Sequence, residues 1–248
     1  SLASLPRHIG GVGGHRGRLH HARAERQRQQ QQLEDAAASA DYGRSRQGVV
    51  SLLADPGVRD AFNVRKSDPK TLQRYGNNSF GWSLLMARRL VALGVNMVQV
   101  NLGNMGTWDL HGNAFPLAKN YLFPPTDLAI SALLEDLDQS GLLDDTLVVV
   151  AGEFGRTPKI NKMNSRDHWP KANFAFLAGG GMNLGQVIGA TDKHGNEPIE
   201  RPIKFQEVFA TLYHNLGIDL AGATVEDSSG RPHFLVDPGI KPIRELVG

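Results

Sequence analysis

Two segments of the chain carry side chains of the kinds that hold metal ions. The first, GNMGTWDLHGNAF, contains Asp109 and His111 two residues apart, so in an extended loop both would point the same way. The second, EFGRTPKINKMNSRDHW, contains Glu153 near its start and His168 near its end. Each segment directly follows an apolar run with the composition of a β-strand. We therefore expect Asp109, His111, Glu153 and His168 to share one cation.

The donor types restrict the metal. The chain has no cysteine, so thiolate ligands are excluded. Oxygen and imidazole donors suit zinc, calcium, magnesium or manganese. Arg156 keeps its charge, and its planar fork suits phosphate or sulfate, so we expect it to bind an anion. A metal ion beside an arginine can stabilise the charge on a group being transferred.

Each candidate also has a purely structural interpretation. Asp109 could cap a turn, Glu153 and Arg156 could pair with each other, and His168 could be a packed histidine beside Trp169. The metal hypothesis depends on their joint occurrence after two strands. No Ser or Thr lies in a recognisable nucleophile motif, so the sequence does not identify a nucleophile. Further along, "GATDKHGNEP" places Asp192 and His194 either in the site or in a polar turn.

The elements that must position these residues alternate between helix and strand. Apolar residues at helical spacing, each time ended by a glycine, occupy 79–94, 124–141 and 205–217, and strand-like runs occupy 95–102, 146–152 and 173–181. Thr126 is the expected N-cap of the second helix. This alternation predicts an α/β fold with a mostly parallel, doubly wound sheet and flanking helices. In such a sheet, ligands bind beyond the carboxyl ends of the strands, where the two segments would meet.

Composition sets the class of the protein and its organisation. With 248 residues, of which 40% are apolar and 21% charged, the chain can bury a sizeable core. We expect residues 1–47 to be a basic, Gln-rich, disordered or partly helical segment, and residues 48–248 to form the α/β domain. Tyr42 is the only Phe, Trp or Tyr in that segment, which disfavours stacking on nucleic acid bases. No apolar run approaches the roughly 20 residues that span a membrane.

Several motifs together resemble the bacterial family called domain of unknown function 1501, which is often labelled sulfatase-like. The motifs lie within residues 48–246 and are TWDLHGNAF, LLEDLDQSGLLDDTLVVVAGEFGRTPKIN, RDHWP, LAGGGMNLGQVIGATDKHG and GRPHFLVDPGIKPIREL. The family is similar to alkaline phosphatases and sulfatases. The resemblance implies their α/β fold and a metal-dependent hydrolase acting on a small-molecule or glycan phosphate or sulfate ester. It also implies export, although the first residues lack the apolar core of a signal peptide.

The chain departs from the pattern of alkaline phosphatases and sulfatases at two places, and these departures change the number of metal ions and the activity that we expect. Where the superfamily has Asp-His-Gly, this chain has Glu153, Phe154 and Gly155, and the phenyl ring cannot ligate, which favours a single metal ion. Nothing in residues 1–47 resembles the superfamily's first strand with its nucleophile. We therefore expect an N-terminally truncated member with weak or no turnover. The alternatives are a non-catalytic exported binding or scaffold protein, and a nucleic-acid binder working through the basic segment.

Overall fold

The computed structural model describes residues 54–104 and 106–247, so the expected segment 1–47 and its boundary lie outside the described residues. The chain divides into two compact units, residues 1–59 and 60–248. The first is described only where helix α2 (Pro56–Phe62) begins. There Asp55 Oδ1 accepts hydrogen bonds from the backbone N–H groups of Gly57 (2.7 Å) and Val58 (3.2 Å). Asp55 is therefore the N-cap of α2.

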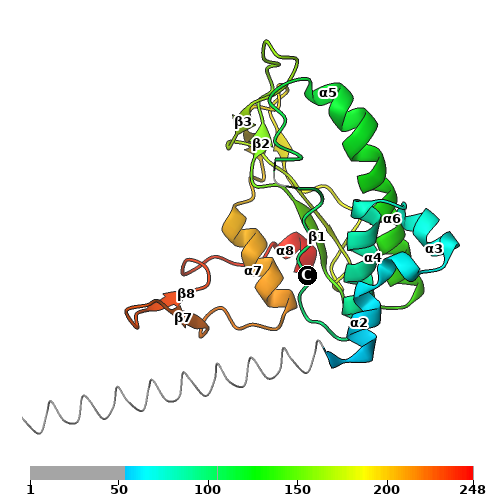
Figure 1. Ribbon diagram of the computed structural model, residues 1–248. Coiled ribbons are helices and arrows are strands. Elements are labelled where there is room, and N and C mark those ends of the chain that lie inside the picture. The colour runs from blue at the N-terminus through cyan, green and yellow to red at the C-terminus, as the bar shows by residue number, and fades with distance from the viewer. Residues whose placement is uncertain (1–53, 105, 248) are drawn as a thin grey trace, which may run out of the picture. The chain divides into compact units, whose positions relative to one another are not determined.

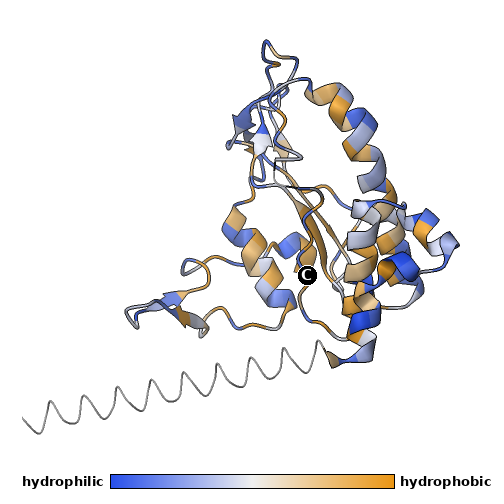
Figure 2. Ribbon diagram, in the orientation of Figure 1, coloured by the Kyte–Doolittle hydropathy of each residue, from blue (hydrophilic) through white to orange (hydrophobic). Residues whose placement is uncertain are grey.

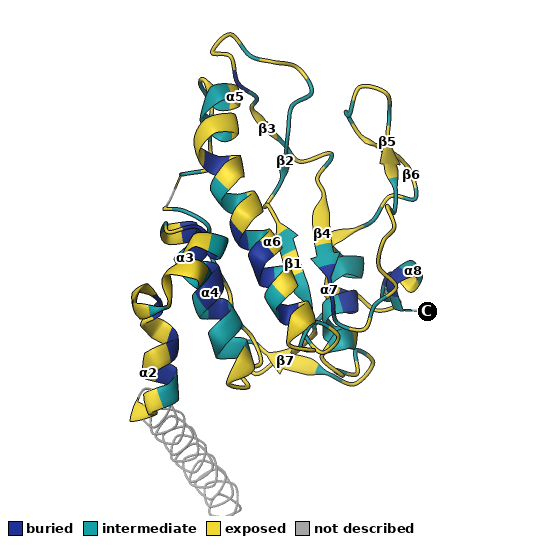
Figure 3. Cartoon of the chain, turned by 90° about the vertical axis from the view of Figure 1, so that its right-hand side faces the viewer, coloured by how far each residue is buried: buried dark blue, intermediate teal, exposed yellow. Residues whose placement is uncertain are grey.

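Three helices of the second unit form a layer, namely α3 (Pro69–Tyr75), α4 (Ser79–Ala92) and α6 (Phe123–Gln139). Their buried faces and Val64 of the short 3₁₀ helix Val64–Lys66 make up the core. The helices contribute Tyr75, Leu84, Leu85, Ala129, Ala132, Leu133 and Leu137. Figure 3 shows these buried positions as dark blue stretches along the helices. Gly81 allows α4 to start close to α3, since an added Cβ would lie 2.3 Å from the Tyr75 carbonyl oxygen. As predicted, α4 is a helix that ends before Gly94 (φ +84°).

The second predicted helix begins earlier than expected. Helix α5 (Ala114–Leu117) and a π-helical turn, Ala118–Leu122, run without a break into α6. The wider turn precedes Pro124 and Pro125, which have no N–H to donate to the carbonyls one turn back. Thr126 is consequently inside the helix, where its hydroxyl donates to the Leu122 carbonyl (2.7 Å), and its prediction as an N-cap is wrong.

All strand pairing among the described residues is antiparallel and two-stranded. Val148 to Ala151 pair with Ala178 to Ala175 in reverse order. The pairs are β1 (Val148–Ala151) with β4 (Ala175–Ala178), β2 (Gly155–Arg156) with β3 (His168–Trp169), β5 (Ala190–Thr191) with β6 (Pro198–Glu200), and β7 (Thr224–Glu226) with β8 (Pro232–Phe234).

The prediction of a mostly parallel, doubly wound sheet is therefore wrong. Two parallel neighbours need a crossover connection, usually a helix. Between β1 and β4 the chain instead forms the β2–β3 ribbon and returns alongside β1 in the opposite direction. Residues 95–102, expected to be a strand, have no strand assignment. β1 is also not covered on both faces, because Val149 on it and Phe176 on β4 remain 38% and 43% exposed.

The β1–β4 ribbon lies between two groups of helices. Figures 1 and 3 show α4 and α6 on one side and α7 (Phe205–Asn215) with α8 (Arg244–Val247) on the other. Val148 of β1 packs against the helical core. In Figure 2, β1 is hydrophobic, whereas the loops around β2 and β3 are mainly hydrophilic. The polar loops beyond the end of β1 therefore hold the candidate site. Within the described ranges, no helix is both long and apolar enough to cross a membrane.

Candidate metal centre

Three of the four predicted ligands converge at the end of the β2–β3 ribbon. Asp109 Oδ1 lies 2.7 Å from His168 Nε2 and 2.9 Å from His111 Nε2. The two imidazole Nε2 atoms are 3.0 Å apart. Among the described residues, these three atoms form a group in which each could serve as a ligand to one metal ion. One carboxylate oxygen and two imidazole nitrogens are a donor set that suits zinc and the divalent transition metals.

Short backbone pairing fixes two of the site residues relative to each other. Arg156 on β2 is the register partner of His168 on β3. The neighbouring Gly155 permits this because an added Cβ would lie 1.8 Å from the Ala172 carbonyl oxygen. The loop with Asp109 and His111 comes from a distant part of the chain and needs another attachment.

Arg156 supplies that attachment. Its Nη2 donates to the Trp108 carbonyl (2.9 Å) and to Asp109 Oδ1 (3.1 Å). Its Nη1 donates to the carbonyls of Leu110 (3.3 Å) and Arg166 (3.1 Å). One guanidinium thus joins the loop that carries Asp109 and His111 to the loop that carries His168. Anion binding by Arg156 stays a prediction, and the four contacts indicate a positioning role.

A second carboxylate orients His111. Asp167 Oδ1 lies 3.2 Å from His111 Nδ1, the ring nitrogen opposite the cluster. Asn161 Nδ2 donates both to the same Asp167 oxygen (3.0 Å) and to the His111 carbonyl (3.2 Å). A carboxylate on Nδ1 favours the tautomer that leaves Nε2 free to ligate, as is common behind metal-bound histidines.

The ring of His168 packs between two other rings. Its centroid is 4.2 Å from that of Phe154 and 4.7 Å from that of His111. Phe154 stands where the resemblance to alkaline phosphatases and sulfatases leads us to expect a histidine. In this structure it contacts a candidate ligand and limits the orientations open to the His168 ring.

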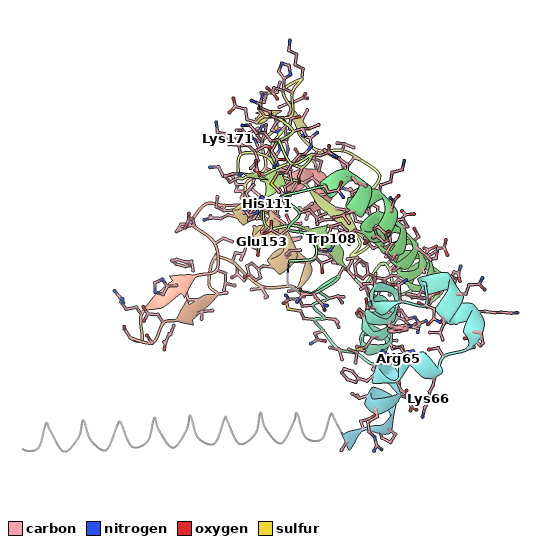
Figure 4. All side chains as sticks on the ribbon, turned by 45° about the horizontal axis from the view of Figure 1, so that its top comes forward. Arg65, Lys66, Trp108, His111, Glu153 and Lys171 are labelled. Atoms are coloured by element: carbon pink, nitrogen blue, oxygen red, sulfur yellow. The ribbon has the colours of Figure 1, made fainter. Side chains whose placement is uncertain are left out.

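Glu153, the fourth expected ligand, is not in the three-atom cluster. It is exposed and follows the end of β1. It nevertheless lines the same extended cleft as Asp109, Arg156 and His168. Figure 4 labels His111 and Glu153 at this end of the second unit, with Lys171 on the outer loop. The structure therefore brings Glu153 to the cleft but not to the ligand atoms.

Hydrogen bonding keeps the carboxylates of the site ionised. The hydrogen bond from His168 lowers the pKa of Asp109 below its ordinary value. The pKa of Asp167 is also lowered, first by its bond from Asn161 and then by His111. Ionised carboxylates are the form that metal binding and histidine orientation require.

The remaining candidates, Asp192 and His194, lie in the turn between β5 and β6. Asp192 accepts hydrogen bonds from the backbone and side chain of Asn196, at 2.7 and 3.1 Å. Of the two interpretations of this segment, a part of the metal site or a polar turn, the structure therefore supports the polar turn. Trp169 Nε1 donates to the Asn196 carbonyl (2.5 Å), which attaches this turn next to His168.

Sequence reasoning did not single out the roles of Asp167 and Asn161. Asp167 directly precedes a predicted ligand, and a carboxylate near a ligating histidine is a recognised signal. Asn161 carries no comparable signal, because its contacts depend on how the loop folds back onto His111.

Comparisons with known proteins support one assignment. A family model described as "Protein of unknown function (DUF1501)" matches residues 13–247. Comparison with curated proteins and with solved structures gives no significant match.

Proposed function

The chain belongs to the DUF1501 family, and we propose that it is a metal-dependent hydrolase-type domain acting on a phosphate or sulfate ester. The convergence of Asp109, His111 and His168 carries the proposal. We also propose that the family's chemistry is related to that of sulfatases and alkaline phosphatases, on the strength of the motifs around these residues.

The residues fit a divalent cation. The donor atoms lie within 3.0 Å of one another, and the carboxylate is held ionised. A divalent ion at this position would polarise an ester oxygen and lower the pKa of water. Asp167 orients His111, Phe154 packs on His168, and Arg156 holds the two ligand loops together.

The cleft determines what can approach. The side chains of Asp109, His111 and His168 are 51%, 44% and 42% exposed, so small-molecule and glycan esters can reach them. Glu153 lines the same cleft without joining the cluster. We propose that Glu153 accepts a proton from the attacking water, a role open to a carboxylate near a metal ion.

Metal stoichiometry and affinity of the purified chain test the proposal, followed by hydrolysis of an aryl phosphate and an aryl sulfate. We expect one divalent ion per chain, weaker binding in His168→Ala, and slow turnover that Glu153→Gln decreases. A folded wild-type chain that binds no divalent ion would refute the proposal.

A second candidate is a non-catalytic binding or scaffold protein. The specific observation in its favour is that Arg156, the expected anion ligand, donates to four protein oxygens. This candidate predicts that the metal-loaded chain binds an aryl sulfate or aryl phosphate without hydrolysing it. Turnover that His168→Ala abolishes would eliminate it.

A further inference from the structure

We infer that the exposed rings of Trp108 and Phe123 form a subsite beside the metal centre, which binds the organic part of the ester. The subsite takes a ring with an apolar face, which an aryl group and the C–H face of a sugar both provide. The inference rests on the proposed function, because it specifies the group to which the phosphate or sulfate is attached.

Trp108 is held in a fixed position next to a candidate metal ligand. It directly precedes Asp109, whose Oδ1 contacts both histidines of the cluster. Its indole Nε1 donates to the Leu102 carbonyl (2.6 Å), and its own carbonyl accepts a hydrogen bond from Arg156 Nη2 (2.9 Å). Both the ring and the backbone of Trp108 are therefore fixed relative to the metal centre.

Two phenylalanines extend the indole ring into a larger aromatic surface. The Trp108 ring centroid is 6.3 Å from that of Phe80 and 6.2 Å from that of Phe123, with interplanar angles of 32° and 36°. Phe80 is buried, whereas Trp108 and Phe123 are 39% and 58% exposed. Phe80 thus packs behind the surface, and the other two rings remain accessible to a ligand.

One cleft connects these rings to the metal centre. Its lining includes Trp108, Phe123, Asp109, Arg156 and His168. An apolar surface combined with a few polar groups in one cleft is typical of small-molecule sites. A phosphate or sulfate group at the metal centre therefore leaves its organic substituent in the cleft that the rings line.

Packing on aromatic rings makes the subsite selective for the shape of the organic group. An aryl ring stacks on an aromatic side chain or meets it edge to face, and both arrangements add to the energy of apolar burial. The C–H face of a sugar ring gains dispersion contacts and buries area on the same surface. A methyl group covers too little of either ring to gain as much. Esters that carry a ring should therefore bind more tightly than methyl esters with the same anionic group.

Calorimetric titration of the Mn²⁺-loaded full chain with phenyl phosphate, a glucopyranosyl phosphate and methyl phosphate tests the subsite. The three ligands share the phosphate ester group and differ in its organic substituent. We expect at least one of the two ring-bearing esters to bind roughly 3- to 10-fold more tightly than methyl phosphate. Whichever ring gives the larger gain identifies the source of the organic group.

Two variants remove one ring each, and a third is the matched control. Phe123→Ala and Trp108→Ala should each reduce the preference for the ring-bearing ester while Mn²⁺ affinity stays at the wild-type value. Trp108→Phe keeps a ring and should keep most of the preference. Tyr121→Ala removes an exposed aromatic ring two residues before Phe123 that is not part of the cleft lining, so it should behave like the wild type.

The outcomes separate this inference from the proposed function. A chain that binds Mn²⁺ but gives equal affinities for the three phosphates, or binds none of them, would overturn the subsite. The preference persisting in full in both Phe123→Ala and Trp108→Ala would overturn it as well. In these cases metal binding by the chain still supports the proposed function. A folded chain that binds no divalent ion would instead refute the proposed function itself.

Discussion

Arg156 Nη2 and Asp109 Oδ1 are 3.1 Å apart, although 47 residues separate them in the sequence. The same guanidinium bonds carbonyl oxygens on both loops that carry the candidate ligands. A metal centre built on two loops needs such a connection, because each loop alone could move its donor atoms out of position. The residue that the sequence suggested for the substrate therefore stabilises the site itself.

Replacement of Arg156 by lysine tests this connection. An ammonium group is a point charge and cannot make the four directed bonds of the guanidinium. We expect Arg156→Lys to lower Mn²⁺ affinity by roughly 10- to 100-fold, the range found when groups that orient metal ligands are removed. Calorimetric titration measures the affinity. The control is Lys162→Ala, which removes an exposed charge from the same loop. Equal affinities for wild type and Arg156→Lys would disprove the positioning role.

Asp167 gives a second prediction at the centre. In Asp167→Ala, His111 loses the carboxylate on its Nδ1 and with it the preference for the ligating tautomer. We expect metal affinity to fall roughly 10- to 100-fold while the fold is retained, because the side chain is 53% exposed. Asp167→Asn keeps an acceptor oxygen, so its metal affinity should lie between those of the wild type and Asp167→Ala. If metal affinity fell in Asp167→Asn but stayed at the wild-type value in Asp167→Ala, this mechanism would be contradicted.

The helices could be predicted from the sequence because their signals are local. Apolar spacing located α4, α6 and α7, and the expected stop glycines adopt positive φ, for example Gly141 (+68°) and Gly217 (+72°). Left-handed backbone of this kind brings no Cβ clash for glycine, so glycine is the residue most favoured there. The early start at Ala114 was missed because prolines 124 and 125 suggested a beginning rather than a continuation.

Strand pairing could not be predicted in the same way. The apolar runs at β1 and β4 identified strands, but an apolar run does not specify its partner or its direction. The sequence does contain evidence against a parallel pair. Residues 152–174 lack the apolar spacing of a helix, which is the usual connection between parallel neighbours.

The candidate site could be predicted only in part, because residue type reveals possible ligands but not the backbone groups that position them. Asp109, His111 and His168 could be selected by residue type and by their place after apolar runs, and the structure brings them together. The role of Arg156 depends on backbone carbonyls of Trp108, Leu110 and Arg166. Every residue has a carbonyl, so the sequence contains no signal for which ones a guanidinium will reach.

A buried polar group in the helical layer leads to a stability prediction. Tyr75 is 1% exposed, and its hydroxyl donates to Asp136 Oδ2 (2.7 Å), while Arg74 is paired with the other Asp136 oxygen. Burial, followed by the bond to Asp136, raises the pKa of Tyr75 far above its ordinary value. We expect Asp136→Ala to lower the free energy of unfolding by about 3 kcal/mol, because it leaves the buried Tyr75 hydroxyl and Arg74 without their acceptor.

The matched variant Tyr75→Phe should lower the free energy of unfolding by only about 1 kcal/mol, since Asp136 keeps its partner Arg74. Urea unfolding of the two single variants and the double variant measures these values and their coupling. Additive effects would show that the Tyr75–Asp136 bond contributes nothing of its own. Metal affinity should be the same in all three, because the pair lies outside the metal centre.

The contact between α7 and α8 gives a prediction about pH. Arg201 Nε and Nη2 donate to the two carboxylate oxygens of Glu245 (2.8 and 3.0 Å), and its Nη1 donates to Glu207 (3.0 Å). The hydrogen bonds from Arg201, followed by a backbone hydrogen bond at Glu245 itself, lower the pKa of Glu245 from 4.5 to about 2. A carboxyl group whose pKa is lower in the folded state stabilises the fold above its unfolded pKa. That contribution is complete above about pH 4.5 and is lost as pH falls towards about 2.

We therefore expect the thermal midpoint of the wild type to decline between about pH 5 and pH 2 more steeply than that of Glu245→Gln. The difference between the two curves isolates Glu245, since the other carboxylates titrate in both proteins. Glu226→Gln, which changes an exposed carboxylate on β7, should follow the wild-type curve. Parallel curves for wild type and Glu245→Gln would mean that the pair with Arg201 does not persist in solution. In that case α8 would be held to α7 chiefly by the buried bond from the Ile243 backbone N–H to the Thr211 hydroxyl (2.9 Å).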